Sequence, residues 1–249
     1  MTRLTRLALV LTLPLLLAGC ASSAYTWGWY VVMPTTPRGT SNMMFLLGGM
    51  ALTIQLSIVS IVLSVLLGLV VAMIGLTGSR IGRYFNVAYV EIFRSVPMLI
   101  MILWVYYGLP VLLGISLNPF IAGVIALVLC DSAFEAEIFR AGIQSIHKGQ
   151  TEASDSLGLS YADKMRFVVL PQAIRRILPP LGNQFVYMLK ASSLVSVIGL
   201  MELTRRANEL TVVEYRPLEI YTALLLEYLL LILIVSYFVR RLEKHLRVD

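Results

Sequence analysis

The sequence predicts an all-α membrane protein with a core of five transmembrane helices. Of its 249 residues, 58% are hydrophobic and 14% are charged, and the mean hydropathy of +0.83 is too high for an ordinary soluble domain. Five long apolar blocks each supply roughly the 20 residues with which a helix crosses the hydrocarbon core. Because the apolar runs are continuous rather than alternating, they favour helices over a β-barrel.

The chain starts with a segment typical of export signals. Arg3 and Arg6 precede the apolar run 7–17, which is too short to span a membrane comfortably. The run ends in Leu-Ala-Gly-Cys, which resembles a bacterial lipobox, so we predict a signal peptide over 1–19 and name Cys20 as a candidate lipidation site. The alternative is an ordinary cleaved signal or a short retained helix.

After this segment we expect an interfacial stretch and then the membrane domain. Residues 20–43 are rich in Ser, Thr, Gly, Pro, Trp and Tyr, a composition typical of a chain at headgroup level. The membrane domain is predicted over 44–245, without an internal repeat that would favour an inverted-repeat transporter. Its expected spans are 44–76, 89–113, 120–138, 178–200 and 220–239.

Lys and Arg predict the orientation, because they gather in cytoplasmic loops. Basic residues are concentrated in alternate gaps between the spans and after the last one, whereas residues 114–119 hold no charge. We therefore expect the N-terminus outside, the C-terminus inside and the loop 141–177 in the cytoplasm. The basic residues of the rich gaps are Arg80, Arg83, Arg140, Lys148, Lys164, Arg166, Arg175, Arg176, Arg240, Arg241, Lys244 and Arg247.

Other function classes find little support. The formal net charge of +6 falls in these gaps and not on a basic face interleaved with aromatics, so nucleic-acid binding is not expected. Cys20 and Cys130 suggest neither a disulfide framework nor a metal site. His147 and His245, the only histidines, lack metal-ligand spacing, and the sequence lacks a Gly-x-Ser-x-Gly elbow. We predict a protein that is not an enzyme and binds no metal.

The cytoplasmic loop carries the signals of two short helices. Glu152 and Asp155 are expected in the first turn of one helix, where acids favour the helix dipole. Gly158 suits its C-terminal cap, and Ser160 with Asp163 resembles a capping box that starts the next helix. Such a loop is typical of a docking surface for a soluble partner.

The order of residues in this loop resembles the EAA loop of ABC-importer permeases. Glu152 opens a Glu-Ala-Ser triplet, Gly158 follows, and a Val-Val-Leu-Pro run ends at Pro171. Flanking segments resemble the polar amino acid uptake branch of these permeases, and the likeness covers about residues 44–245. These segments are Tyr-Tyr-Gly-Leu-Pro at 106–110, Ile-Phe-Arg-Ala-Gly at 138–142, Pro-Pro-Leu-Gly-Asn at 179–183, Ser-Val-Ile-Gly-Leu at 196–200 and Glu-Leu-Thr-Arg at 202–205.

The resemblance implies a type I permease core in the bacterial inner membrane, which moves a polar amino acid or a related compound. Such permeases pair as homo- or heterodimers, receive solute from a binding protein outside, and dock a coupling helix on a cytoplasmic ATPase dimer. This chain has no Gly-x-x-x-x-Gly-Lys-Ser/Thr loop, so a partner subunit would use the ATP. The implied coupling residues are Glu152, Ala153, Ser154, Leu157, Gly158 and Pro171; relatives usually have Ala at position 154 and often Pro at position 147.

Ionisable residues within the spans are the second clue, because they usually face a cavity or a partner. Asp131 and Glu135 share one helix face. Either they line the solute path and favour a cationic group, or they pair with Arg140 or Lys190. Lys190 is likewise a candidate path residue or a structural partner of Glu227 or of an acid on another subunit.

A local ion pair is expected between Glu91 and Arg94, three residues apart, next to a hinge at Pro97. The competing function is a secondary transporter or channel without an ATPase partner. It would use the same spans and buried charges, but it would not need a capped docking loop with the EAA spacing.

Overall fold

The computed structural model describes residues 25–246, and within that range the chain is helical with no β-strand. The predicted signal at 1–19 and Cys20 lie outside the described residues. The elements are η1 (Trp29–Val31), α2 (Pro37–Leu76), α3 (Arg80–Ser95), α4 (Met98–Leu103), η2 (Trp104–Gly108), α5 (Leu109–Leu113), α6 (Pro119–Gln144), α7 (Lys148–Ser156), α8 (Tyr161–Asp163), η3 (Lys164–Val169), α9 (Leu170–Ala191), η4 (Ser192–Ile198), α10 (Leu203–Glu214) and α11 (Pro217–Leu246).

The first span is longer than the sequence predicted. α2 has 40 residues and begins at Pro37, because the Thr36 side chain caps the Gly39 N–H and proline suits the first helical position. Residues 37–43 therefore belong to the first helix, which begins seven residues before the predicted span start at 44. At about 1.5 Å per residue, α2 is roughly 60 Å long.

The second predicted span, 89–113, is not one straight helix. α3 and the segment Met98–Leu113 meet at a bend of 97°, and the segment Tyr161–Ile198 meets α10 at 49°. Val96 precedes Pro97 and has an extended backbone, which ends α3, and Pro97 is the N-cap of α4. Three described helices are long and apolar enough to span a membrane, or up to five if each bent pair is one span.

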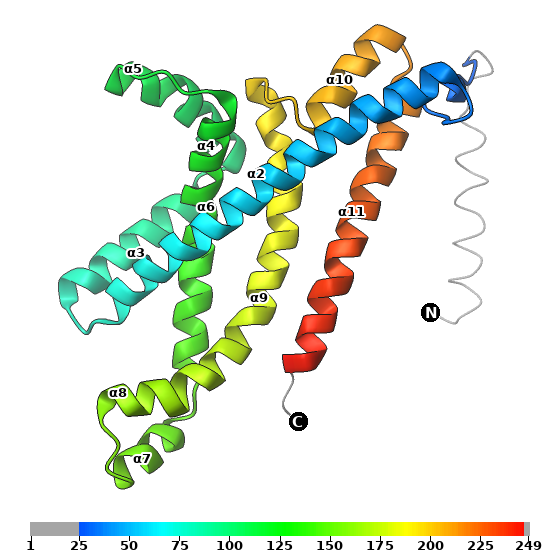
Figure 1. Cartoon of the computed structure of the whole chain (residues 1–249). Helices are drawn as coiled ribbons and strands as arrows, with labels where there is room; N and C mark the ends of the chain where they lie inside the picture. Colours follow the sequence, from blue (N-terminus) through cyan, green and yellow to red (C-terminus); the bar gives the residue numbers. More distant parts are fainter. Residues whose placement is uncertain (1–24, 247–249) are drawn as a thin grey trace, which may run out of the picture.

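α6 lies at the centre of the bundle. It packs along α2 and also contacts α3, α4 and α9. Small residues allow the closest approach to α2: a Cβ added to Gly68 would lie 2.8 Å from the Glu135 Cβ. Figure 1 shows α2 running across α6 and α9, with α11 beside α9.

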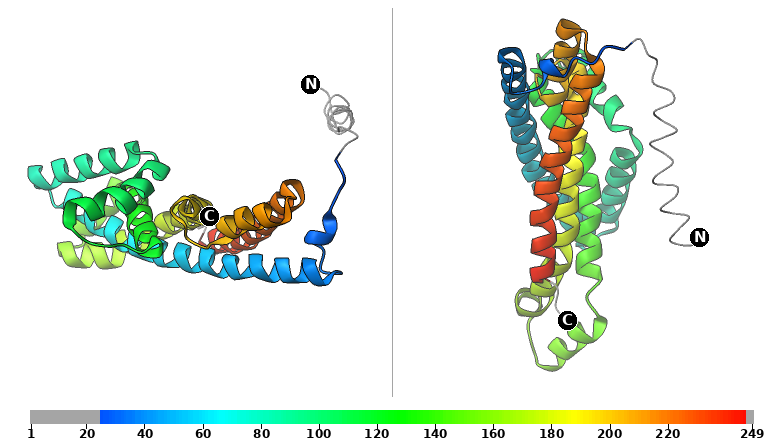
Figure 2. Two further views of the ribbon diagram at one scale, coloured as in Figure 1. Left: turned by 90° about the horizontal axis from the view of Figure 1, so that it is seen from above. Right: turned by 90° about the vertical axis from the view of Figure 1, so that its right-hand side faces the viewer.

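The two ends of the bundle differ. α7 and α8 project from the end at which the α2–α3 turn and the end of α11 also lie (Figures 1 and 2). At the opposite end lie α5, α10 and the segment 25–36. There Tyr25 and the Gly28 N–H both donate hydrogen bonds to Glu219 at the start of α11, the latter at 2.6 Å. The described part of the predicted interfacial stretch is thus tied to the helical core.

Candidate functional site: a projecting loop and a buried acid pair

Local hydrogen bonds cap both ends of α7. His147 Nδ1 accepts from the Gly149 N–H at 3.1 Å. At the other end, the Leu159 N–H reaches the Ser154 carbonyl and the Gly158 N–H reaches the Asp155 carbonyl, which is a Schellman motif. Gly158 has φ +70°, so the prediction that it caps this helix is confirmed.

The prediction that Glu152 and Asp155 lie in the first turn of this helix is wrong. α7 starts at Lys148, which places Glu152 fifth and Asp155 eighth in the helix, beyond the reach of its N-terminal dipole. Asp155 instead accepts a hydrogen bond of 2.7 Å from the Lys164 ammonium, which ties α7 to the segment after α8.

The second cap forms as a variant of the predicted box. Ser160 Oγ accepts from the Asp163 N–H at 3.2 Å, and it also donates to the Asp163 carboxylate at 2.5 Å. The carboxylate thus binds the Ser160 hydroxyl and not its backbone N–H, so the cap prediction holds for one of its two bonds. The π-helical segment Lys164–Val169 follows, and Pro171 stands at the second position of α9.

The six predicted coupling residues divide into outward and inward ones. Glu152, Ala153, Gly158 and Pro171 are exposed, as is Leu157 with 79% of its surface free. Ser154 is only 3% exposed, and its hydroxyl donates to the Gln150 carbonyl at 2.6 Å. The exposed coupling residues therefore combine the acid Glu152 with small and apolar side chains, while Ser154 is buried.

The acid pair is sealed inside the subunit. Asp131 and Glu135 are both 0% exposed. Asp131 accepts hydrogen bonds from Ser64 of α2, at 3.2 Å, and from Gln184 of α9. Glu135 has no hydrogen-bond partner in the described part of the chain.

Neither acid pairs with the basic residues proposed for it. Arg140 makes its ion pair with Glu137, at 3.7 Å, and Lys190 is exposed and makes no ion pair within residues 25–245. Glu227 is 7% exposed, and its carboxylate has no described partner. The alternatives that paired Asp131 or Glu135 with Arg140 or Lys190, and Lys190 with Glu227, are wrong for this subunit.

The predicted local pair of Glu91 with Arg94 is wrong as well. Arg94 forms its ion pair with Glu137 of α6 and lies 4.9 Å from the centre of the Phe134 ring. Sequence reasoning missed Glu137, since its partner lies 43 positions away. The only available signal was its spacing of three residues from Arg140.

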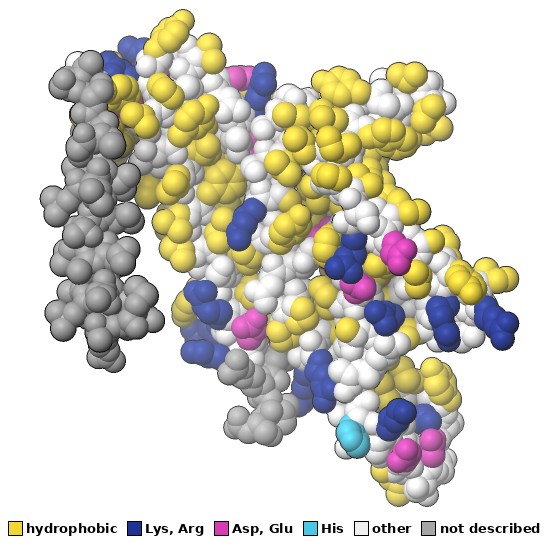
Figure 3. Space-filling view, turned by 180° about the vertical axis from the view of Figure 1, so that it is seen from behind, with side chains coloured by type: hydrophobic (Ala, Val, Ile, Leu, Met, Phe, Trp, Pro, Cys, Tyr) yellow, Lys and Arg dark blue, Asp and Glu magenta, His cyan; other side chains and the backbone are white. Residues whose placement is uncertain are grey.

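Basic side chains are unevenly distributed between the two ends of the molecule. In the space-filling view, most of the visible Lys and Arg side chains gather near the end that carries α7 and α8, while hydrophobic side chains cover much of the rest (Figure 3). Within residues 25–246, no group of three or more His, Cys, Asp or Glu side chains could hold a metal ion.

A family model, the binding-protein-dependent transport system inner membrane component, matches residues 64–248. The chain belongs to this family. The resemblance seen in the sequence is thereby confirmed: the protein is a permease subunit of an ABC importer, it is not an enzyme, and ATP is hydrolysed on a separate chain.

Relatives and solved structures agree with this assignment. The glutamine transport system permease protein of Escherichia coli K12 is 34% identical over 88% of this chain and 98% of its own length. The arginine transport system permease protein of Bacillus subtilis 168 is 36% identical over 82% and 93%. A crystal structure of an amino acid ABC transporter with histidines matches with a TM-score of 0.82 and 35% identity, covering 89% of this chain and 100% of that one.

A more distant structure supports the fold alone. The inward-facing MetNI methionine ABC transporter matches with a TM-score of 0.70 at 21% identity, over 84% of this chain and 99% of that one. The predicted type I permease architecture is confirmed, with the bends described above as its departure from five straight spans.

Proposed function

We propose that this chain forms, together with a second permease chain, the membrane path for a polar amino acid delivered by a solute-binding protein from outside. The second chain is a copy of this one or a related permease. The amino acid class is supported by relatives named for glutamine and arginine transport. A conformational change of a cytoplasmic ATPase dimer would be transmitted to the membrane path through α7.

The outer face of α7 is the observation that carries the proposal. Glu152, Ala153 and Leu157 are exposed on a helix whose two ends are capped and whose Asp155 is tied to Lys164. An exposed leucine beside an alanine is unfavourable in water and becomes favourable when a partner groove covers it. A helix with fixed ends transmits displacement to α9, because little of the motion is lost in the loop.

The proposed orientation places α7, α8 and the C-terminus in the cytoplasm of a bacterium and the segment 25–36 outside. The gathering of Lys and Arg at the α7 end supports it (Figure 3). An outside N-terminus agrees with an export signal at 1–19, and lipidation of Cys20 remains a proposal that mass spectrometry of the mature protein would test.

The candidate path residues now rank differently. Lys190 is exposed on α9 and is the better candidate for contact with a solute carboxylate. Asp131 and Glu135 are buried between helices of one subunit, so solute would reach them only if α2 and α6 separate. A competition assay on Asp131→Asn and Glu135→Gln tests this role, and an unchanged solute preference in both variants rejects it.

The proposal is tested by co-purification from mild detergent. Leu157→Asp adds a charge at the centre of the proposed contact without touching a described hydrogen bond, so we expect loss of the co-purifying ATPase and at least a tenfold loss of transport. Ile81→Asp is the matched control, because Ile81 is also a highly exposed apolar residue, 82% exposed, at the same end of the bundle.

Two outcomes would contradict the proposal. One is an ATPase that stays bound and active with Leu157→Asp. The other is a folded wild-type protein without a nucleotide-binding partner, which would favour a secondary transporter or a channel.

A further inference from the structure

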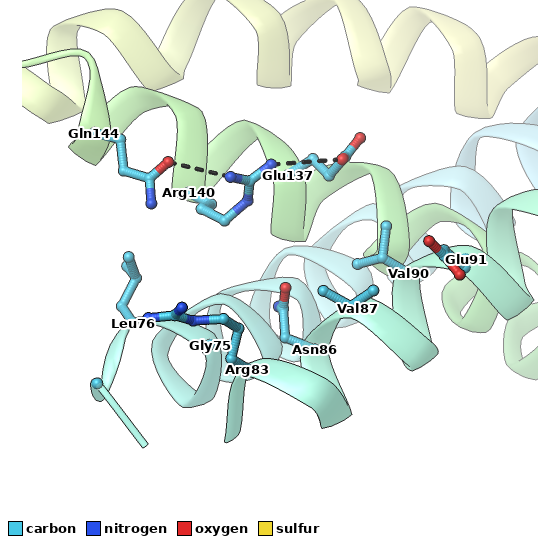
Figure 4. Close-up of a pocket in the computed structure, with 11 residues that line it drawn as sticks. Gly75, Leu76, Arg83, Asn86, Val87, Val90, Glu91, Glu137, Arg140 and Gln144 are labelled. Carbon is cyan, nitrogen blue, oxygen red and sulfur yellow. Dashed lines mark hydrogen bonds and ion pairs between the residues drawn. The ribbon is translucent and has the colours of Figure 1, made fainter. Parts of the chain in front are cut away.

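A charged cavity opens between α3, the end of α2 and the cytoplasmic half of α6. Its volume is about 460 Å³, within the usual range for small-molecule sites. In contrast to the apolar membrane-facing surface, its lining includes two arginines, two glutamates and two side-chain amides (Figure 4). No residue assigned to coupling or to the solute path lines it.

The charges of this cavity that are unpaired within the described residues lie apart. Arg83 of α3 lies towards the end that carries Gln144 of α6, and Glu91 lies towards the other end; the Arg140–Glu137 ion pair of α6 lies between them (Figure 4). Arg140 donates to the Gln144 side chain at 3.1 Å, which fixes the direction of its guanidinium group.

Part of this charge is already neutralised within the protein. Glu137 is shared between Arg94 and Arg140, through separate carboxylate oxygens. Arg83 and Glu91 make no ion pair within the described residues. The unmatched groups are therefore a cation at one end and an anion at the other.

The spacing of these two groups selects the ligand. Arg83 and Glu91 are eight residues apart on α3, so their Cα atoms are separated by about 12 Å along the helix axis at 1.5 Å per residue. In a neutral amino acid, the ammonium lies next to the carboxylate and would leave Glu91 unmatched. We propose that this cavity is a cytoplasmic-side site for a free amino acid with a cationic side chain. Its carboxylate would bind Arg83 and Arg140, and its side-chain cation would bind Glu91.

Occupancy would have a mechanical consequence, because such a ligand bridges α3 and α6. α3 is one arm of the 97° bend, and α6 leads directly into α7. A bound amino acid would resist separation of these helices. The inference rests on the proposed function for its solute class and cytoplasmic placement.

Protection of an introduced cysteine tests the site locally in the purified permease–ATPase complex. In a Cys20→Ser, Cys130→Ser background, Val87→Cys places a thiol in the cavity lining, since Val87 lines it and is 46% exposed. L-Arginine and L-lysine should slow its reaction with a water-soluble maleimide at least fivefold, and glycine should not. Tyr84→Cys is the matched control: it is exposed on the same helix, outside the lining, and should show no protection.

The charge assignment is tested by adding Glu91→Gln or Arg83→Gln to the Val87→Cys chain. Each should weaken protection by L-arginine about tenfold, whereas Arg80→Gln, on the same helix but outside the lining, should not. Equal protection by glycine, no protection by L-arginine, or protection only by dispersed phosphatidylethanolamine would overturn the inference. If uptake and ATPase coupling persist when protection fails, the proposed function stands without this site.

Discussion

The α7–α8 loop and the Asp131–Glu135 pair are both polar, but they are stabilised in opposite ways. In the loop, short-range hydrogen bonds fix the backbone and leave the outer side chains exposed. In the pair, both side chains are fully buried, and the partners of Asp131 come from two other helices. The loop is therefore specified locally and leaves its outer side chains exposed, whereas the pair depends on the packed bundle.

The largest expected effect is in the buried region. Asp131→Leu removes the acceptor shared by Ser64 and Gln184, which leaves Gln184 without a described partner and Ser64 with only the Ile61 carbonyl. Because buried unsatisfied groups cost about 1–3 kcal/mol each, we expect the unfolding free energy in detergent to fall by about 3 kcal/mol.

Glu135→Met is the matched change four residues away. Its carboxylate has no described partner, so its removal should leave stability unchanged or raise it. Equal destabilisation by Asp131→Leu and Glu135→Met would show that the two acids act as one unit and would break the distinction between them.

The second largest loss of stability is expected from a steric change next to the Asp131–Glu135 pair. Gly68→Val would place atoms against the Glu135 Cβ and the Ser132 carbonyl, each 2.8 Å from an added Cβ. We expect a loss of about 2 kcal/mol, because overpacking in a filled interface forces the helices apart. Leu66→Val on the exposed side of α2 is the control for thermal unfolding, and a comparable loss there would argue against a tight α2–α6 contact.

A change in the C-terminal cap of α7 should lower stability less than the two changes in the bundle. An added Cβ at Gly158 meets no atom within 4 Å, so Gly158→Ala tests only the left-handed backbone at φ +70°. The conformational cost is about 1–2 kcal/mol, and it should appear as faster amide exchange in α7 with an unchanged global unfolding midpoint. A lowered global midpoint would mean that the loop contributes to the bundle and is not independent of it.

The smallest effect is expected for the Lys164–Asp155 contact. Lys164→Gln should cost about 0.2–1 kcal/mol of local stability, because Asp155 is 60% exposed and its pairing is screened. Amide exchange across α7 at low and high salt measures this: the difference between wild type and variant should shrink as salt rises. A difference independent of salt would indicate packing rather than charge.

Short-range features of the loop were predictable from the sequence, and long-range ones were not. Gly158 and Ser160 act on atoms three to five residues away, so their caps follow from residue type and spacing. The start of α7 was misplaced because Glu152 and Asp155 resemble first-turn acids, yet the helix begins at Lys148. The exposure of Leu157 and the burial of Ser154 depend on how α7 packs against the segment Lys164–Val169.

By itself, the sequence determined the membrane class, the approximate positions of the five apolar blocks, the family and the caps of the α7–α8 loop. Hydropathy, basic residues between spans and turn residues act over one helix or less, which is why they could be interpreted without coordinates. Only the tertiary structure decided the 97° bend after α3, the partners of Asp131 and the pairing of Arg94 with Glu137. Ser64 lies 67 positions from Asp131 and Gln184 lies 53 positions from it, and helix packing alone brings them together.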